Sequence, residues 1–419
     1  MRKFRTAVIG CGKVGDFHAE AYAKSEYSDF VAVYARSYDK AKRLADKYGV
    51  KPYTDIETMI RESGVEVVSI CTPHPAHADP AVTAAKCGAH VLCEKPLATT
   101  LEDCDRILNA AEEAGVQVGT ICQRRFYEPC MRVHRAIEDG KIGTPIIGTA
   151  FMHSWRDEAY YRSDPWHGTW AGEGGGAMVS QSSHLLDMLL WFMGDVDEVY
   201  GVWKNYNHPY IEVEDTAVAV IKFKNGALGN IIVSNSQNPG LYGKVHVFGS
   251  NGASIGVQTD GGSMFIAGMT SVAEPPFNDL WTVKGEEDML EKWRREDEEL
   301  FSKIDFTTHY HLVQIDDFLS ALAEGRRPLV TGEDGRIFTN AYVDSVKKIS
   351  VYAEKDGHLS FITTSQSFLP GATDDGLPAF TKLNAVKNPE SAQSISWMSS
   401  PSASAGKAVV RYAEKAGYE

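Results

Sequence analysis

The sequence lacks a CxxC pair, an apolar run long enough to span a membrane, and an excess of basic residues. Seven cysteines are present, and all lie between Cys11 and Cys130, so we expect reduced thiols and not a disulfide framework. No run approaches the roughly 18 apolar residues of a membrane-spanning helix. The apolar run after the basic N-terminal residues is only about five residues long and stops at Gly10, too short for a secretion signal. These absences predict a cytoplasmic protein.

The charge balance excludes further classes of partner. The 419 residues carry a formal charge of −14, and the isoelectric point is about 5.4. We therefore expect neither nucleic acid nor an anionic membrane surface as a partner. The length allows more than one domain, and a hydrophobic content of 43% is ordinary for a globular protein with packed cores.

Strand-like and helix-like segments alternate strictly over about the first 120 residues. The β-rich runs "RTAVIG", "FVAVYAR", "VEVVSICTP", "HVLCEKP" and "VQVGTIC" are separated by amphipathic stretches of helical pattern. The third run is almost continuously apolar, as is typical of a parallel strand that is buried on both faces. The alternation predicts an α/β Rossmann domain, with a doubly wound parallel sheet, over residues 1–124.

The pattern changes after about residue 145. "DTAVAVIKFKNGALGNIIVSNS" alternates with period two around the hairpin signal Asn225-Gly226, and "KVHVFGSNGASIGV" repeats the pattern. We predict that residues 125–363 form an α+β domain with an open, mostly antiparallel sheet for substrate binding and oligomerisation. Amphipathic helices are expected over residues 306–325 and 335–355, and a C-terminal helix of this part can pack back on the first domain. Residues 364–419, rich in Ser, Pro, Gly and Ala, are expected to form an extended tail or arm.

A glycine-rich turn separates the first strand from the first helix. "GCGKVGDFH" has the GxGxxG spacing, which provides a tight turn, a close approach of backbone to pyrophosphate, and close helix–strand packing. The helix N-terminus adds free N–H groups and the positive end of its dipole. Because the motif begins a long βαβ series, it predicts a dinucleotide site; the alternative is a glycine turn without a ligand. The predicted cofactor contacts are Gly10, Gly12, Lys13, Val14, Gly15, Arg36, Ser37, Thr72, Pro73, His77, Glu94 and Lys95.

The second strand ends without the acidic residue that hydrogen-bonds the ribose of NAD in many Rossmann folds. Arg36 and Ser37 stand there instead, and both suit a 2′-phosphate. The sequence therefore favours NADP over NAD. An arginine that stacks on adenine would be compatible with either cofactor, so both stay open.

Four segments together resemble the Gfo/Idh/MocA oxidoreductase family over residues 4–355. They are "AVIGCGKVGDFHA", "VSICTPHPAHADPAVTAAKCGAHVLCEKPLATTLED", "GEGGGAMVSQSSHLLDMLLWFMG" and "VEDTAVAVIKFKNGALG". The resemblance implies a dinucleotide-binding domain joined to an open-faced sheet domain, which forms a homodimer or homotetramer. It also implies oxidation or reduction, with NAD(P), of a hydroxyl of a sugar, sugar derivative or cyclitol.

The same resemblance assigns particular residues. The lysine of the EKP motif maps onto Lys95, the motif histidine onto His184, and the second acidic residue onto Asp187. The family usually has Asp or Asn four residues before that histidine, whereas this chain has Ser180. The departure puts in doubt an acid–base relay through a carboxylate at that position.

Lys95 and His184 are the predicted catalytic residues. Lys95 lies at the carboxyl end of a parallel strand, where open α/β sheets bind ligands, and its ammonium can stabilise developing alkoxide charge. The alternative is a salt bridge with Glu94, but neighbours on a strand point to opposite faces. A histidine has an ordinary pKa near neutrality, so His184 can accept a hydroxyl proton. The alternative for His184 is a core histidine bonded to backbone.

Residues 153–170, "HSWRDEAYYRSDPWHGTW", form the predicted substrate loop. Its aromatic rings can pack against the C–H faces of a sugar, and its polar groups can bind hydroxyls; ordinary packing under a long loop is the alternative. One of Arg124 and Arg125, which follow the last parallel strand, is expected to be functional. The predicted substrate contacts are Arg125, Tyr161, Trp166, His167, Trp170, Ser180, His184 and Asp187.

No metal site is predicted. His74 and His77 lie beside Pro75 at a strand end, and His309 and His311 are expected on different faces of a helix, so no set of three ligands is expected.

The residues together favour an oxidoreductase that transfers hydride between nicotinamide and a secondary hydroxyl or ketone of a sugar, glycoside or cyclitol. One alternative is a redox-assisted glycoside-cleaving enzyme with a tightly bound cofactor. Another is a non-catalytic dinucleotide sensor, which would need the glycine turn but neither Lys95 nor His184.

Overall fold

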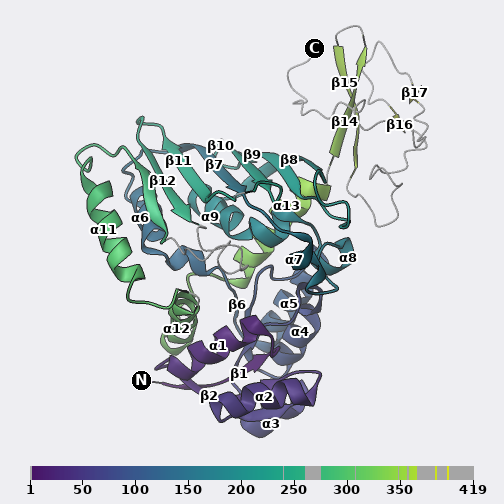
Figure 1. The fold of residues 1–419 in the computed structure, drawn as a ribbon, viewed down its shortest axis with the longest axis vertical. Helices are drawn as coiled ribbons and strands as arrows, with labels where there is room; N and C mark the ends of the chain where they lie inside the picture. Colours follow the sequence, from purple (N-terminus) through teal and green to yellow (C-terminus); the bar gives the residue numbers. More distant parts are fainter. Residues whose placement is uncertain are drawn as a thin grey trace.

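A computed structural model describes most of the chain. The described residues are 2–238, 240–259, 275–306, 308–347, 349–355, 358–365, 383–384 and 394–395. Figure 1 shows the first domain in the lower part of the molecule and the second sheet in the upper part, with helix α9 (Ser183–Met193) beneath that sheet.

The first domain is a six-stranded parallel sheet with the order β3-β2-β1-β4-β5-β6, as the alternation predicts. All four residues of β4 are buried, because helices cover both faces of the sheet. The strands are β1 (Phe4–Ile9), β2 (Ser28–Tyr34), β3 (Lys51–Tyr53), β4 (Val67–Ile70), β5 (His90–Cys93) and β6 (Val118–Thr120).

Local signals set the ends of several helices in this domain. The side chains of Asp55 and Thr100 accept hydrogen bonds from the backbone of the first turns of α3 and α5. Gly49, Gly64 and Gly115 end α2, α3 and α5 in the left-handed conformation. The helices are α1 (Lys13–Lys24), α2 (Tyr38–Tyr48), α3 (Ile56–Ser63), α4 (Ala78–Lys86) and α5 (Leu101–Ala114), with the 3₁₀ turn η1 (His74–Ala76) before α4.

The second domain contains a seven-stranded sheet with the order β13-β12-β11-β7-β10-β9-β8. Only β7 and β10 pair in parallel; the other neighbours are antiparallel. The predicted open, mostly antiparallel sheet is confirmed. The strands are β7 (Pro145–His153), β8 (Val196–Lys204), β9 (Thr216–Phe223), β10 (Leu228–Ser234), β11 (Gly243–Gly249), β12 (Ser254–Thr259) and β13 (Phe277–Trp281).

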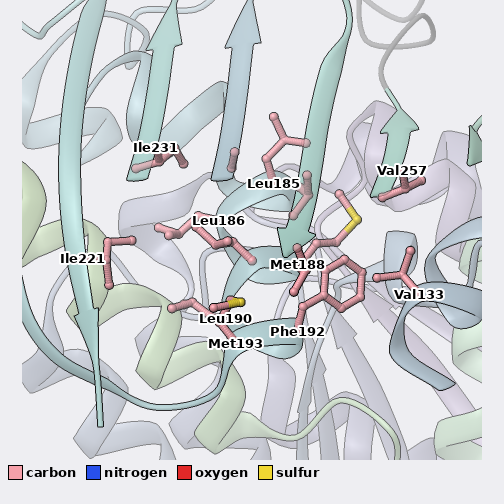
Figure 2. Packing of buried hydrophobic residues seen from close by; sticks show 14 of the residues in the cluster. Val133, Leu185, Leu186, Met188, Leu190, Phe192, Met193, Ile221, Ile231 and Val257 are labelled. Atoms are coloured by element: carbon pink, nitrogen blue, oxygen red, sulfur yellow. The ribbon is translucent and has the colours of Figure 1, made fainter. Parts of the chain in front are cut away.

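One face of this sheet packs on α9 and α6 (Glu128–Glu138). Figure 2 shows Leu186 and Met188 of α9 beside side chains of the sheet and Val133 of α6. Alternate residues of β9 are buried, as the period-two pattern requires. The short elements that lead into α9 are η2 (Gln123–Phe126), α7 (Glu158–Arg162), α8 (Trp170–Glu173) and the single π-helical turn η3 (Ala177–Gln181).

The chain returns to the first domain after the sheet. Ile315, Phe318 and Leu319 of α12 (His309–Glu324) share a core with Phe4 and Tyr22. This packing joins the two parts of the molecule. The remaining helices are α11 (Met289–Phe301) and α13 (Gly332–Lys347). In the described ranges, no helix has the length and apolar character needed to cross a membrane.

The helix expected over residues 335–355 is partly wrong. Helix α13 ends at Lys347, and residues 349–355 form β14 (Ile349–Lys355), which pairs antiparallel with β15 (His358–Ser365). The β-branched residues Ile349 and Val351 alternate with Ser350 and Tyr352, a pattern that favours a strand. A two-residue pair, β16 (Leu383–Asn384) with β17 (Ser394–Ile395), follows. The rest of the predicted tail lies outside the described residues.

Candidate active site

The glycine turn has the shape that a pyrophosphate needs. Gly10 has φ +110°, and a Cβ there would lie 2.6 Å from the carbonyl carbon of Cys71. A Cβ on Gly15 would lie 1.9 Å from the carbonyl oxygen of Gly10. A Cβ on Gly12, in contrast, would meet nothing within 4 Å, and Gly12 is the N-cap of α1. The protein thus leaves open space at a helix N-terminus, where anions bind, and the turn fits a dinucleotide.

This difference predicts separate effects for two substitutions. We expect Gly12→Val to keep the thermal unfolding temperature near that of the wild type but to weaken dinucleotide binding at least about tenfold, because the side chain would fill the open space. Gly15→Val should instead destabilise the fold, because its Cβ overlaps the backbone at Gly10. Isothermal titration calorimetry and thermal unfolding would measure both effects. Unchanged dinucleotide affinity in Gly12→Val would contradict this use of the turn.

The other predicted cofactor residues are at least partly exposed, with one exception. Arg36 and Ser37 follow β2 and are exposed, and Val14 is exposed in the first turn of α1. His77 is the exception. It is fully buried, and its ring nitrogens lie 2.9 Å from the Pro96 oxygen and 2.8 Å from the Thr72 oxygen. The prediction of a direct cofactor contact is therefore wrong for the His77 ring, which links the loops after β4 and β5.

Lys95 lies immediately beyond β5, at the carboxyl edge of the parallel sheet. Its Nζ is 3.4 Å from the backbone oxygen of Ser180, which lies in η3 of the second domain. Burial is the main cause that lowers the pKa of Lys95; Arg124 lowers it further, and Glu94 raises it. The lysine thus faces the second domain as a partly exposed cation.

Glu94 turns to a different set of partners. Its Oε1 accepts a hydrogen bond from His18 Nε2 at 2.9 Å and lies 3.6 Å from His311 Nε2. Although burial alone would raise the pKa of Glu94, these two histidines hold it well below its ordinary value. The Glu94 carboxylate is thus an anion that anchors its loop. Glu94 and Lys95 have different partners, as the alternation along the strand predicts.

The expectation that no three metal ligands come together is wrong. Ligand atoms of His18, Glu94 and His311 all lie within 4.8 Å of one another. The three residues come from α1, the end of β5 and α12, so their spacing in the sequence gave no signal. In the described part of the chain, Nδ1 of both histidines lacks a hydrogen-bond partner, whereas a metal-bound histidine usually donates from its second nitrogen. The absence of a metal stays a prediction.

His184 is in the first turn of α9 and is partly exposed. Neither ring nitrogen forms a hydrogen bond to another residue in the described ranges. Burial, followed by the nearby charges of Arg124 and Lys95, holds the pKa of His184 well below its usual range. The ring is therefore neutral, and its nitrogens can accept a hydrogen bond. A core histidine bonded to backbone, the alternative reading, does not describe it.

Two predicted substrate contacts bind each other instead. Arg125 Nη2 is 2.6 Å from Asp187 Oδ1, and both side chains are buried, with exposed fractions of 4% and 3%. Arg125 also contacts Asp334 at 3.3 Å. Neither Arg125 nor Asp187 is available to a substrate, and these two predictions are wrong. Arg124 is the neighbour that lies near Lys95 and His184, since its charge lowers the pKa of both.

The aromatic loop divides into packing residues and partly exposed residues. Tyr161 is buried and bonded through its hydroxyl to Asn235 Nδ2 at 3.1 Å. Trp170 packs against the core of the second domain, with its ring 5.4 Å from that of Trp203, but it is partly exposed. Tyr161 is therefore a packing residue, whereas the substrate contact of Trp170 stays a prediction. Trp166 and His167 are partly exposed, and the Trp166 ring lies 5.0 Å from that of His74, beside the first domain.

The sequence analysis did not identify Glu173, whose carboxylate contacts the side chain of Ser180. Ser180 Oγ donates to Glu173 Oε1 at 2.6 Å, and the backbone of Gly168 donates to Glu173 Oε2 at 2.7 Å. Glu173 has an exposed fraction of 1%, and its burial raises the pKa to about 7. A glutamate directly before three glycines, at positions 174–176, was the available signal.

Comparison with known proteins confirms the resemblance. Residues 4–121 match the NAD-binding Rossmann fold of the GFO/IDH/MocA oxidoreductase family, and residues 130–255 match the family's C-terminal domain. Myo-inositol 2-dehydrogenase of Thermotoga maritima is 32% identical over 256 residues, which are 59% of this chain and 73% of that protein.

The chain belongs to the GFO/IDH/MocA oxidoreductase family.

Two further proteins that are similar to this chain are named as dehydrogenases. The scyllo-inositol 2-dehydrogenase (NAD(+)) of Bacillus subtilis is 29% identical over 59% of this chain and 72% of its own length. The WlbA dehydrogenase of Bordetella pertussis, solved with NADH and UDP-GlcNAcA, superposes with a TM-score of 0.71 and 25% identity. That match covers 82% of this chain and 96% of the other. The protein is thus an oxidoreductase with an NAD-binding Rossmann domain.

Proposed function

We propose that this enzyme transfers hydride between the nicotinamide of NAD(P) and a secondary hydroxyl or ketone of a sugar, glycoside or cyclitol. The observation that carries the proposal is the group of Lys95, Ser180 and His184 at the carboxyl edge of the parallel sheet. Lys95 contacts the backbone of Ser180, and His184 lies close enough to Lys95 for the lysine to lower its pKa. All three residues are partly exposed. The inositol dehydrogenases among the relatives support this substrate class.

The chemistry follows from the charges of these groups. When bound, the nicotinamide accepts or supplies the hydride. The Lys95 ammonium donates a hydrogen bond to the reacting oxygen and stabilises the negative charge that develops there. The neutral ring of His184 accepts the hydroxyl proton during oxidation and returns it during reduction.

A second function uses the same groups. Transient oxidation of a sugar hydroxyl acidifies the neighbouring C–H bond and allows elimination of a glycosidic group, with no net consumption of cofactor. A non-catalytic dinucleotide sensor is disfavoured, because it would need neither Lys95 nor His184.

For the cofactor we propose NADP, with NAD as the alternative. Arg36 and Ser37 are exposed at the carboxyl end of β2, where a guanidinium and a hydroxyl can bind a 2′-phosphate. The NAD named for the inositol relatives is the reason to test both dinucleotides.

A panel of sugars, glycosides and inositols, each with NAD and with NADP, would test the function by the absorbance of reduced cofactor. We expect reduction of cofactor with at least one cyclitol or pyranose and a higher kcat/KM with NADP. Glycoside release without reduced cofactor would favour the eliminating enzyme. No turnover of any panel member in either assay would contradict both functions.

We also propose that the second sheet joins two copies of the chain. Its outer face is not covered by a helix in the described ranges, and Val202, Val218 and Ile232 are cross-strand neighbours on β8, β9 and β10. Their exposed fractions are 45%, 37% and 37%, and Val220 and Leu228 add 50% and 60%. Such a contiguous apolar face is typical of a subunit interface.

A lysine in the centre of this face should separate the subunits. We expect Val218→Lys to convert the wild-type dimer or tetramer to a smaller species in light scattering after size exclusion, because an ammonium would be buried without a partner. Ile337→Lys, at an exposed apolar position on α13, is the matched control and should leave the oligomer unchanged. A wild type that is monomeric at micromolar concentration would contradict the proposed interface.

A further inference from the structure

Position 180 carries a serine and not an acidic residue, yet the carboxylate of another residue contacts this serine. Glu173 is the last residue of α8, and the chain then turns back so that Ser180 of η3 lies above it. The hydroxyl of Ser180 donates to Glu173 Oε1 at 2.6 Å. The proposed active site therefore has an ionisable carboxyl group one hydrogen bond away from Ser180 Oγ.

Ser180 joins Glu173 to Lys95 through two different atoms. Its backbone oxygen accepts from Lys95 Nζ at 3.4 Å, and its hydroxyl donates to Glu173. The opposite charges of Lys95 and Glu173 also attract each other without forming an ion pair, since each favours the charged form of the other. A change of charge on Glu173 consequently alters the hydrogen bond of Ser180 and the electrostatic surroundings of the proposed catalytic lysine.

The second oxygen of Glu173 is fixed in place. Gly168 donates its backbone N–H to Oε2 at 2.7 Å, so the carboxylate cannot rotate away from Ser180 without losing a buried hydrogen bond. The other titratable groups that interact with Glu173 are Glu214, Tyr160 and Tyr161. Among these neighbours, Lys95 is the cation that compensates the glutamate.

We propose that Glu173 is a positioning residue of the active site, which acts through the Ser180 hydroxyl and replaces the carboxylate that position 180 lacks. The inference rests on the proposed dehydrogenase function. With Glu173 ionised, the Ser180 hydrogen is held by the carboxylate, and the Oγ lone pairs can accept only. Ser180 then orients a substrate hydroxyl beside Lys95. With Glu173 protonated, its own hydrogen can point to Ser180 Oγ, and the serine loses this fixed acceptor role.

A second buried glutamate provides a matched control. Glu214 is fully buried, and burial raises its pKa to about 7, as for Glu173. Its oxygens accept from the backbone of Gly176 at 2.7 Å and Met178 at 3.0 Å, and not from a side chain of the active site. Substitution of Glu214 thus reports the cost of losing a buried carboxyl group near this part of the chain without the link to Ser180.

The test compares Glu173→Gln, the double variant Glu173→Gln/Ser180→Asp, and Glu214→Gln with the wild type. For the best panel substrate, kcat and KM for oxidation are measured between pH 5.5 and 9, together with dinucleotide affinity and thermal unfolding. In the wild type, kcat should rise as pH increases through about 7, because Glu173 ionises there. Glu173→Gln should lower kcat at least about tenfold, with a smaller change in KM, and should remove this inflection.

The other variants separate positioning from structure. Ser180→Asp in the Glu173→Gln background should recover at least half of the loss in log kcat, because it restores a carboxylate at the site. Glu214→Gln should reduce thermal stability but retain an inflection, shifted at most to lower pH, because the charge of Glu214 no longer opposes the ionisation of Glu173. A Glu173→Gln enzyme with wild-type kcat and pH profile would overturn the inference. Loss of kcat with the inflection intact and no rescue would overturn it too. A wild type without turnover on the whole panel would instead refute the proposed function, and the inference with it.

Discussion

Lys95→Ala should lower kcat by roughly 100- to 1,000-fold, because it removes the cation that stabilises charge on the reacting oxygen. Lys95 lies beyond β5, and its ammonium contacts the second domain at the backbone of Ser180. The glycine turn is built from β1 and α1 and does not depend on this side chain. Dinucleotide affinity should therefore change little, and the thermal unfolding temperature should stay near that of the wild type.

Steady-state kinetics and calorimetric titration of the same preparation would measure both quantities. Lys303→Ala, at an exposed lysine after α11, is the matched control and should keep the wild-type kcat. Turnover of Lys95→Ala within a few fold of the wild type would contradict the proposed mechanism. An equal loss of dinucleotide binding would show that Lys95 acts mainly by holding the cofactor.

Arg125→Met should destabilise the protein by roughly 3–5 kcal/mol, because it leaves the buried carboxylate of Asp187 without its partner. The pair is 2.6 Å apart and almost completely buried, and the charge of Asp187 helps to raise the pKa of Arg125 against the opposing effect of burial. Replacement of both residues, in Arg125→Met/Asp187→Leu, should recover most of the loss, because no uncompensated charge then remains in the core.

Urea denaturation followed by tryptophan fluorescence would measure these differences. Arg327 and Glu333 form an exposed ion pair at 3.1 Å, and Arg327→Gln is the matched control, with an expected change below about 1 kcal/mol. If Arg125→Met unfolds at the same urea concentration as the wild type, Arg125 does not hold the buried charge in the way the geometry indicates.

The parts of the molecule that local patterns encode were predicted well. Strict alternation of strands and helices predicts the order of the first domain, and period-two alternation predicts β9 and β10 with their hairpin. The GxGxxG spacing and the EKP motif place the glycine turn and Lys95 at carboxyl ends of strands because both follow a buried strand directly. The period-two pattern of residues 349–355 was available too, and reading it as a helix was an error of interpretation.

Long-range pairing decided the rest of the site. Arg125 and Asp187 are 62 positions apart, and nothing in either neighbourhood shows that they neutralise each other in the core. Arg124 and Arg125 are adjacent and chemically equal in the sequence, and only the packing of α9 determines that Arg124 lies near Lys95. Likewise, His18 and Glu94 are separated by 76 positions and meet only because folding brings α1 to the residue that follows β5.

The sequence by itself determined the family, the parallel and antiparallel sheets, the dinucleotide turn and the positions of Lys95 and His184. These features depend on spacing within single turns or single strand–helix units, and such spacing is visible in one dimension. The tertiary structure decided which charged groups form ion pairs in the core. It also decided which carboxylate accepts a hydrogen bond from Ser180. The role of a charged side chain depends on the partner that it contacts after folding. In the buried interior, that partner largely determines whether the side chain is ionised.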